Sequence, residues 1–218
     1  MMTVDLKRLE PKSNIIKSIV VFFHGYGADG ADLLSIGNAL SEHLPDTLFV
    51  APDAPTKCQM SPFGFQWFPI PDMDGSSEIE AIKELDRICT STNQWIDELI
   101  EKENVKAQDV FLFGFSQGTM LSLYLGPQRL QALGGVIGFS GKLINIDSLK
   151  LKISSKPPIL LIHGDEDPVV SPLSLPEAVK ELKLLNFEVR HHVSIGVAHG
   201  IAPDGLSEAL KFLHDKME

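Results

Sequence analysis

Ser116 is the residue of this chain whose surroundings best suit a nucleophile. It is the centre of Gly114–Gly118 (GFSQG), a G-x-S-x-G sequence that follows the apolar run 110–113 and opens a helical pattern. A strand, a sharp turn and a helix in this order lift a serine hydroxyl above the end of a sheet on a strained backbone. Glycines flank the serine because side chains at those positions would collide with the neighbouring strand and helix. Ser140 lacks this context, since Lys142 replaces the second glycine.

A serine hydroxyl attacks a carbonyl only when a neighbouring base takes its proton. In a strand-turn-helix design of this kind the base follows the last strand. His199 has that position, inside the glycine-bracketed run Gly196–Gly200 (GVAHG), and we predict that it is the base. The other histidines fall in or at the ends of predicted strands and helices: His24, His43, His163, His191, His192 and His214.

The base in turn needs a carboxylate that fixes its orientation, expected in the loop after the preceding strand. That loop is His163–Val170 (HGDEDPVV), with Asp165, Glu166 and Asp167 as candidates. The spacing alone does not choose among them. Pro168 rigidifies the chain beside Asp167 and favours it slightly, whereas Asp165 could cap the turn by accepting backbone N–H groups.

No cofactor is predicted. A metal site built from His163, Asp165 and Asp167 would lack an obvious further ligand, and no H-E-x-x-H or paired-cysteine spacing occurs. The glycine-rich run Phe22–Gly30 (FFHGYGADG) matches neither phosphate-binding pattern. The same run can instead contribute to an oxyanion hole, because its glycines let the backbone approach a substrate carbonyl closely. We predict that the backbone N–H groups of Tyr26 and Gln117 form an oxyanion hole.

Short apolar runs alternate with longer amphipathic ones, which is typical of a mostly parallel sheet covered by helices on both faces. An antiparallel edge strand is expected at Thr3–Leu9. Helix Glu78–Glu103 is expected with an interruption near Thr90–Asn93. The other predicted strands are Ser18–Phe23, Leu48–Ala51, Val110–Phe113, Gly135–Phe139, Ile159–Ile162 and Glu188–Ile195, and the other helices are Asp32–His43, Gln117–Leu125, Glu177–Leu185 and Leu206–Met217.

One connection, Pro52–Gly75, fits neither pattern. It is rich in proline and carries aromatic residues, among them Trp67 and Phe68. Long connections in compact domains are often functional. Its aromatic side chains either pack on the edge of the domain or line a substrate pocket.

The composition fits one domain spanning residues 1–218, with 44% hydrophobic and 22% charged residues. A net charge of −10 excludes nucleic acid as an expected partner and disfavours anionic membranes. The N-terminus lacks the pattern of a signal peptide and no apolar run is long enough to span a membrane. Cys58 and Cys89 are expected to be reduced, which favours a cytoplasmic location.

Taken together, these motifs resemble the phospholipase/carboxylesterase family of α/β-hydrolases, which includes acyl-protein thioesterases. The resemblance implies that Asp167 is the triad acid and that the Pro52–Gly75 connection flanks the acyl site, with Trp67, Phe68 and Val169 as substrate contacts. It also admits a homodimer. The matching segments run in family order: His24–Gly27 (HGYG), Ala51–Pro55 (APDAP), Gln66–Phe68 (QWF), Gly114–Gly118, His163–Val170 and Ala198–Gly200 (AHG).

Two residues depart from the family pattern. Tyr26 stands where thioesterase relatives often carry an aliphatic residue, and Lys142 replaces an aromatic or apolar one. Both changes argue against a long acyl tunnel, so the expected activity is that of a carboxylesterase acting on short to medium acyl chains. The alternatives are thioesterase or lysophospholipase activity on long acyl chains, and a catalytically silent binding module, which would usually lack one of Ser116, Asp167 and His199.

Overall fold

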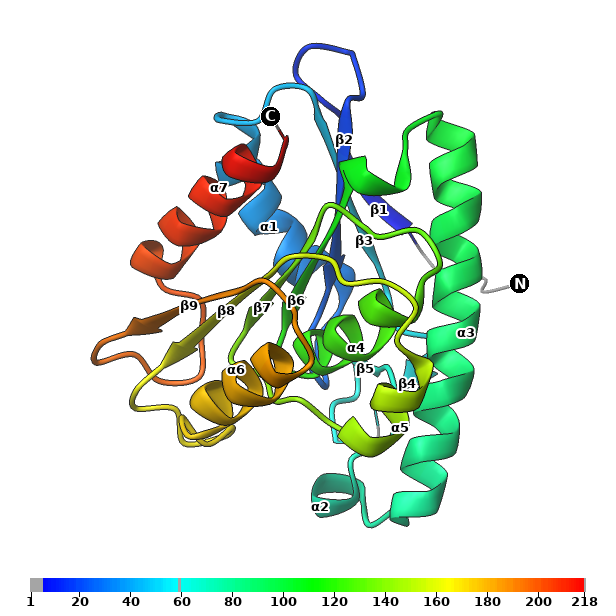
Figure 1. The fold of residues 1–218 in the computed structure, drawn as a ribbon, viewed down its shortest axis with the longest axis vertical. Coiled ribbons are helices and arrows are strands. Elements are labelled where there is room, and N and C mark those ends of the chain that lie inside the picture. Colours follow the sequence, from blue (N-terminus) through cyan, green and yellow to red (C-terminus); the bar gives the residue numbers. More distant parts are fainter. Residues whose placement is uncertain (1–5, 59, 218) are drawn as a thin grey trace.

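A seven-stranded sheet runs through the middle of the structure, a computed structural model that describes residues 6–58 and 60–217 (Figure 1). The strand order is β1-β3-β2-β6-β7-β8-β9, and all neighbours are parallel except β1 and β3. The predicted antiparallel edge strand is confirmed at Leu6–Leu9, and its residues 3–5 lie outside the described residues. The strands are β1 Leu6–Leu9, β2 Ser18–Phe23, β3 Thr47–Pro52, β6 Val110–Phe115, β7 Gly135–Phe139, β8 Ile159–Gly164 and β9 Val189–Ser194.

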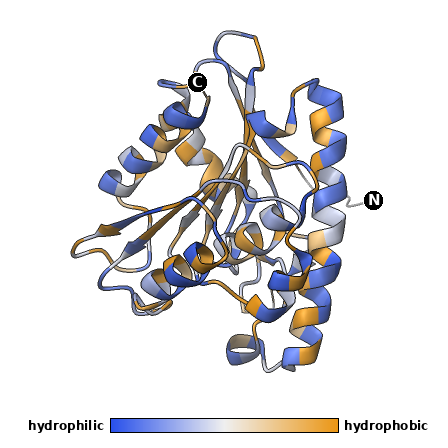
Figure 2. Ribbon diagram, in the orientation of Figure 1, coloured by the Kyte–Doolittle hydropathy of each residue, from blue (hydrophilic) through white to orange (hydrophobic). Residues whose placement is uncertain are grey.

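The interior strands are buried on both faces, as their continuous apolar runs predict. Every residue of β2, β3, β7 and β8 is buried, and β6 differs only at Phe115. Figure 2 shows hydrophobic residues along these strands. β9 forms the second edge of the sheet and is only partly covered, with Arg190, His191 and Val193 exposed and Ser194 buried.

Helices cover both faces of the sheet and complete a three-layer α/β arrangement (Figure 1). One face packs against α1 (Gly30–Ser41) and α7 (Pro203–Met217), and the other against α3 (Glu78–Glu103), α4 (Gln117–Leu125) and α6 (Ser174–Leu184). The sheet and its helices therefore form the predicted α/β-hydrolase architecture. Within the described ranges, no helix is both long and apolar enough to cross a membrane.

The structure corrects several predicted elements. Helix α3 is uninterrupted, so the predicted break near Thr90–Asn93 is wrong. The hydroxyls of Thr90 and Ser91 donate to Asp86 O and Ile88 O on the preceding turn, at 3.0 and 3.1 Å, an arrangement that a continuous helix can accommodate. Helices α1, α6 and α7 begin two or three residues earlier than predicted. The first residues of α1 and α7 are small or polar and carry no apolar period, and α6 has Pro176 in its first turn, where a proline is tolerated. The unpredicted elements are β4 Thr56–Lys57, β5 Phe65–Gln66, α2 Pro71–Asp74, α5 Ile146–Lys152, and the short 3₁₀ turns Ala107–Asp109 and Gly126–Gln128.

Candidate active site

Ser116 sits on the turn between β6 and α4. Its backbone angles are φ 53° and ψ −112°, a sparsely populated region for a residue with a side chain. The surrounding structure holds it there, since the Ser116 N–H donates a 2.9 Å hydrogen bond to Phe139 O on the adjacent strand β7. The residue is 9% exposed and is therefore largely covered by the surrounding chain.

The flanking glycines are required by close backbone contacts. A Cβ on Gly118 would lie 1.8 Å from Phe23 O, and one on Gly114 would lie 2.4 Å from Thr119 N. No side chain fits at either distance. The collision predicted from the sequence is therefore present, and it explains the glycines of the turn without reference to substrate.

His199 and Asp167 form a close hydrogen bond. His199 Nδ1 donates to Asp167 Oδ2 at 2.7 Å, because the carboxylate can only accept. The His199 ring also packs against the ring of Phe115, at a centroid distance of 4.9 Å, directly before Ser116 in the chain. Ser116, Asp167 and His199 follow β6, β8 and β9, so all three lie at the carboxyl end of the sheet, where open α/β sheets place their ligand sites.

The Asp167 carboxylate is buried but well supplied with donors. Its side chain is 0% exposed, and Oδ1 accepts hydrogen bonds from the N–H groups of Val169 and Val170 at 2.8 and 2.9 Å. Burial alone would raise the pKa of Asp167. The hydrogen bonds from His199, Val170 and Val169 outweigh it, so the pKa lies below its ordinary value and the group stays ionised beside the imidazole.

The three carboxylates left open by the sequence now have different surroundings. Asp165 Oδ1 accepts a 2.6 Å hydrogen bond from Gly196 N–H, at the start of the loop that carries His199. Glu166 is exposed. Among these three carboxylates, only Asp167 is hydrogen-bonded to His199. Asp165 instead accepts a hydrogen bond at the start of the loop that carries His199. Among the described residues, no group of three or more His, Cys, Asp or Glu side chains is placed to hold a metal ion.

Sequence reasoning missed His163 as a neighbour of the acid. This residue is 2% exposed at the end of β8, and its Nε2 donates to Val170 O at 3.0 Å. The same nitrogen lies 3.2 Å from Asp167 Oδ2. Its place in a buried strand suggested only packing, and the signal that could have indicated more is its position four residues before Asp167.

The predicted oxyanion loop passes directly beside the serine. A Cβ on Gly25 would lie 3.5 Å from Ser116 Cβ, which is contact distance. Gln117 is the first residue of α4, so its N–H belongs to the helix N-terminal groups that have no partner within the helix. The loop containing Tyr26 and the helix start at Gln117 therefore both border Ser116, as the oxyanion-hole prediction requires.

Trp67, a residue of the connection Pro52–Gly75, joins the two sides of this site by hydrogen bonds. Its backbone N–H donates to Gln117 Oε1 at 2.9 Å, and its indole Nε1 donates to His24 O at the same distance. Gln117 Nε2 returns a 2.7 Å bond to Phe68 O. Trp67 is 1% exposed, and its two N–H donors connect the loop that begins at His24 with the start of α4.

The other two predicted substrate contacts are Phe68, which lines a cleft, and Val169, which lies in an exposed turn. Phe68 lines an open cleft of about 290 Å³ whose lining includes Met120 of α4 and Lys142. Val169 is 61% exposed in the turn beside Asp167 and serves that carboxylate through its backbone N–H. The remaining lining residues are Pro69, Ile70, Pro71, Asp72, Glu78, Ala81, Ile82, Leu85, Ile144 and Asn145.

Comparison with known proteins identifies the family of this chain. The phospholipase/carboxylesterase family matches residues 5–217. The crystal structure of esterase PE8 superimposes with a TM-score of 0.92 and is 38% identical, covering 97% of this chain and 98% of its own. Acyl-protein thioesterase 1 of Saccharomyces cerevisiae is 29% identical over 94% of this chain and 96% of its own length. A phospholipase/carboxylesterase from Dyadobacter fermentans shares the fold, with a TM-score of 0.74 at 23% identity. This chain belongs to the phospholipase/carboxylesterase family and is an ester hydrolase with the α/β-hydrolase fold.

Proposed function

We propose that the protein hydrolyses carboxylic esters of short to medium acyl chains through a covalent acyl-enzyme on Ser116. The observation that carries this proposal is the 2.7 Å hydrogen bond from His199 Nδ1 to Asp167 Oδ2. With its proton on Nδ1, the imidazole presents an unprotonated Nε2, the form that can accept a proton from a serine hydroxyl.

The proposed reaction has two halves. His199 Nε2 takes the proton of Ser116 as its oxygen attacks the ester carbonyl, and the N–H groups of Tyr26 and Gln117 stabilise the oxyanion. The imidazolium then gives its proton to the departing alcohol, which leaves an acyl ester on Ser116. Water, activated by His199, attacks that ester and releases the acid. Asp167 orients the imidazole and stabilises its charged form throughout.

The cleft beside α4 supports a preference for short to medium acyl chains. Its lining is mostly apolar, as an acyl chain requires, but it also includes Lys142, Asp72 and Glu78. Lys142 and both carboxylates are exposed, so these charges border the opening and not a closed tunnel. A long chain laid over this cleft would leave part of its length against charged groups or water.

The relative named acyl-protein thioesterase 1 supports a second candidate, hydrolysis of long-chain acyl thioesters. A matched series of oxygen and sulfur esters from acetyl to palmitoyl separates the two. An optimum at butyryl to octanoyl oxygen esters supports the carboxylesterase, and an optimum at palmitoyl thioesters or lysophospholipids supports the alternative.

Labelling with a fluorophosphonate tests the nucleophile. We expect stoichiometric modification of Ser116, loss of the label in Ser116→Ala, and full labelling in the control Ser207→Ala, which changes an exposed serine of α7. A protein that takes no label, or a Ser116→Ala variant with full esterase activity, would contradict the proposal and favour a silent binding module.

We also infer a cytoplasmic location, on the reduced state expected of two buried, unpaired cysteines, Cys58 and Cys89. Homodimerisation remains a prediction from the family. Sedimentation velocity over a range of protein concentrations tests it, and a single species of 23.9 kDa throughout would contradict it.

A further inference from the structure

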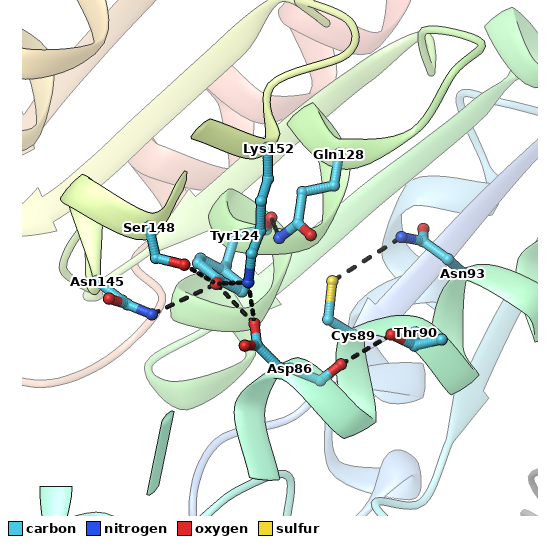
Figure 3. Close-up of polar contacts among 9 residues, drawn as sticks. All are labelled: Asp86, Cys89, Thr90, Asn93, Tyr124, Gln128, Asn145, Ser148 and Lys152. Carbon is cyan, nitrogen blue, oxygen red and sulfur yellow. Dashed lines mark hydrogen bonds and ion pairs between the residues drawn. The ribbon is translucent and has the colours of Figure 1, made fainter. Parts of the chain in front are cut away.

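A polar cluster joins three helices on the α4 side of the sheet (Figure 3). At its centre is the hydroxyl of Tyr124 on α4, which donates to Asp86 Oδ1 of α3 at 2.7 Å. Lys152 of α5 donates to both of these groups, at 2.6 Å to Asp86 and 2.9 Å to Tyr124. Asn145 Nδ2 and Ser148 Oγ complete the cluster, at 3.3 and 3.1 Å from the Tyr124 hydroxyl.

The cluster adjoins the cleft proposed to hold the acyl chain, since Asn145 lines the cleft and donates to the Tyr124 hydroxyl. Met120, which lines the cleft, is one turn after Ser116 and one turn before Tyr124 on α4. Residues four apart on a helix lie on the same face. The cleft wall contributed by α4 is therefore placed between the nucleophile and the Tyr124 hydroxyl.

The other two walls meet the same cluster. On α3, Ile82 lines the cleft and Asp86 follows one turn later. Asn145 belongs to both, because it lines the cleft and donates to Tyr124. On both helices that line the cleft, a residue of the cluster therefore follows a lining residue by one turn: Tyr124 on α4 and Asp86 on α3.

The cluster extends from the interior to the surface. Tyr124 is fully buried, whereas the side chains of Asp86 and Lys152 are 42% and 34% exposed. An alkyl chain advancing along the cleft past Met120 would therefore meet a satisfied network of hydrogen bonds ending in an ion pair, with water beyond it.

We infer that Tyr124, Asp86 and Lys152 form an end-stop that limits the length of acyl chain the enzyme accepts, an inference that rests on the proposed esterase function. Each methylene buried in an apolar cleft raises kcat/KM by about fourfold. That gain ceases at the end-stop, because further methylenes would have to separate hydrogen-bonded groups and leave charges without partners. The substrates selected are esters whose acyl chain ends before the Tyr124 hydroxyl.

The test compares kcat/KM for lauroyl and butyryl esters in the wild type and in two variants. Asp86→Leu with Lys152→Met makes the end of the cleft apolar without leaving either charge unpaired. Tyr124→Phe removes the central hydroxyl and keeps the ring. We expect the lauroyl-to-butyryl ratio to rise about fifteenfold in the double variant, the gain from roughly two further buried methylenes, and by a smaller factor in Tyr124→Phe.

A matched control replaces another ion pair between exposed side chains, Glu208→Leu with Lys211→Met on α7, which lies on the opposite face of the sheet. This control should keep the wild-type ratio. An unchanged lauroyl-to-butyryl ratio in the double variant overturns the end-stop. If the double variant does not fold, an unchanged ratio in Tyr124→Phe overturns it. A wild type inactive on every ester overturns the proposed function itself, together with the end-stop, whereas an active wild type with unresponsive variants overturns the end-stop alone.

Discussion

His163 and Asp167 meet in a buried contact beneath the loop that follows β8, with His163 Nε2 3.2 Å from Asp167 Oδ2. The same nitrogen donates to Val170 O, while the Val170 N–H donates to Asp167 Oδ1. His163 therefore supports the carboxylate in two ways. It places the positive end of an N–H dipole near one oxygen, and it fixes the turn that supplies a donor to the other.

From this arrangement we predict that His163→Phe lowers kcat by about tenfold to a hundredfold, because a misaligned Asp167 no longer holds His199 in register with Ser116. KM should change little, since His163 is buried away from the cleft. His163→Gln offers an amide donor in place of Nε2 and should recover part of the loss. Steady-state kinetics on a butyryl ester checks this, with thermal melts to show that both variants fold. Full kcat in a folded His163→Phe variant would exclude the positioning role.

The three carboxylates of the same loop should differ sharply on substitution. Asp167→Asn removes the charge that stabilises the His199 imidazolium, and we expect kcat to fall by about 10³–10⁴. Asp165→Asn keeps an oxygen that can accept from Gly196 N–H, so activity should stay within a few fold. Glu166→Gln, at an exposed position, is the matched control. Comparable losses at positions 165 and 167 would contradict the assignment of roles.

These residues also show which part of the site a sequence can predict. Ser116 and His199 follow from local context and chain order, because a turn that requires two glycines and a loop after the last strand are both visible in the sequence. The choice of Asp167 over Asp165 is not visible there. It depends on the turn conformation, which directs the N–H groups of Val169 and Val170 to a single carboxylate oxygen.

Contacts between distant segments were also beyond sequence reasoning. Trp67 bonds to residues 43 and 50 positions away, and such pairs leave no periodic pattern. Helix α5 was missed for a related reason: Leu149 is its single buried residue, so no apolar period marks it. The sheet, by contrast, was predictable because short apolar runs of four to six residues alternate with longer amphipathic ones.

Trp67→Phe should weaken oxyanion stabilisation. The change removes the indole donor to His24 O and keeps an aromatic ring in the core, so the loop containing Tyr26 loses one tie to the nucleophile helix. We expect kcat to fall by about tenfold, less than the loss typical of deleting an oxyanion donor outright. Trp95→Phe, on α3, is the matched control and should retain activity. Equal effects of the two tryptophan substitutions would indicate a general packing defect.

His24 should make the stability of the fold depend on pH. Burial lowers the pKa of His24 below its ordinary value of 6.5, and Ala54 N–H donates to His24 Nε2, which must be unprotonated to accept. The unfolded chain therefore binds a proton at His24 that the folded chain does not, and the free energy of unfolding falls as pH drops through the unfolded pKa, by up to about 1.4 kcal/mol per pH unit.

His24→Gln provides an acceptor that does not titrate, so its loss of stability between about pH 7 and pH 5 should be smaller than in the wild type. Urea unfolding across this range measures the difference, with His43→Gln at an exposed position of the chain as the control. On acidification, the free energy of unfolding should fall in parallel in the wild type and the control. Near neutral pH, the curves of unfolding free energy against pH for these two proteins should run parallel to that of His24→Gln, separated from it by a constant offset. If all three lose stability equally on acidification, the folded protein takes up a proton at His24, and the buried Ala54–His24 hydrogen bond does not hold the ring neutral.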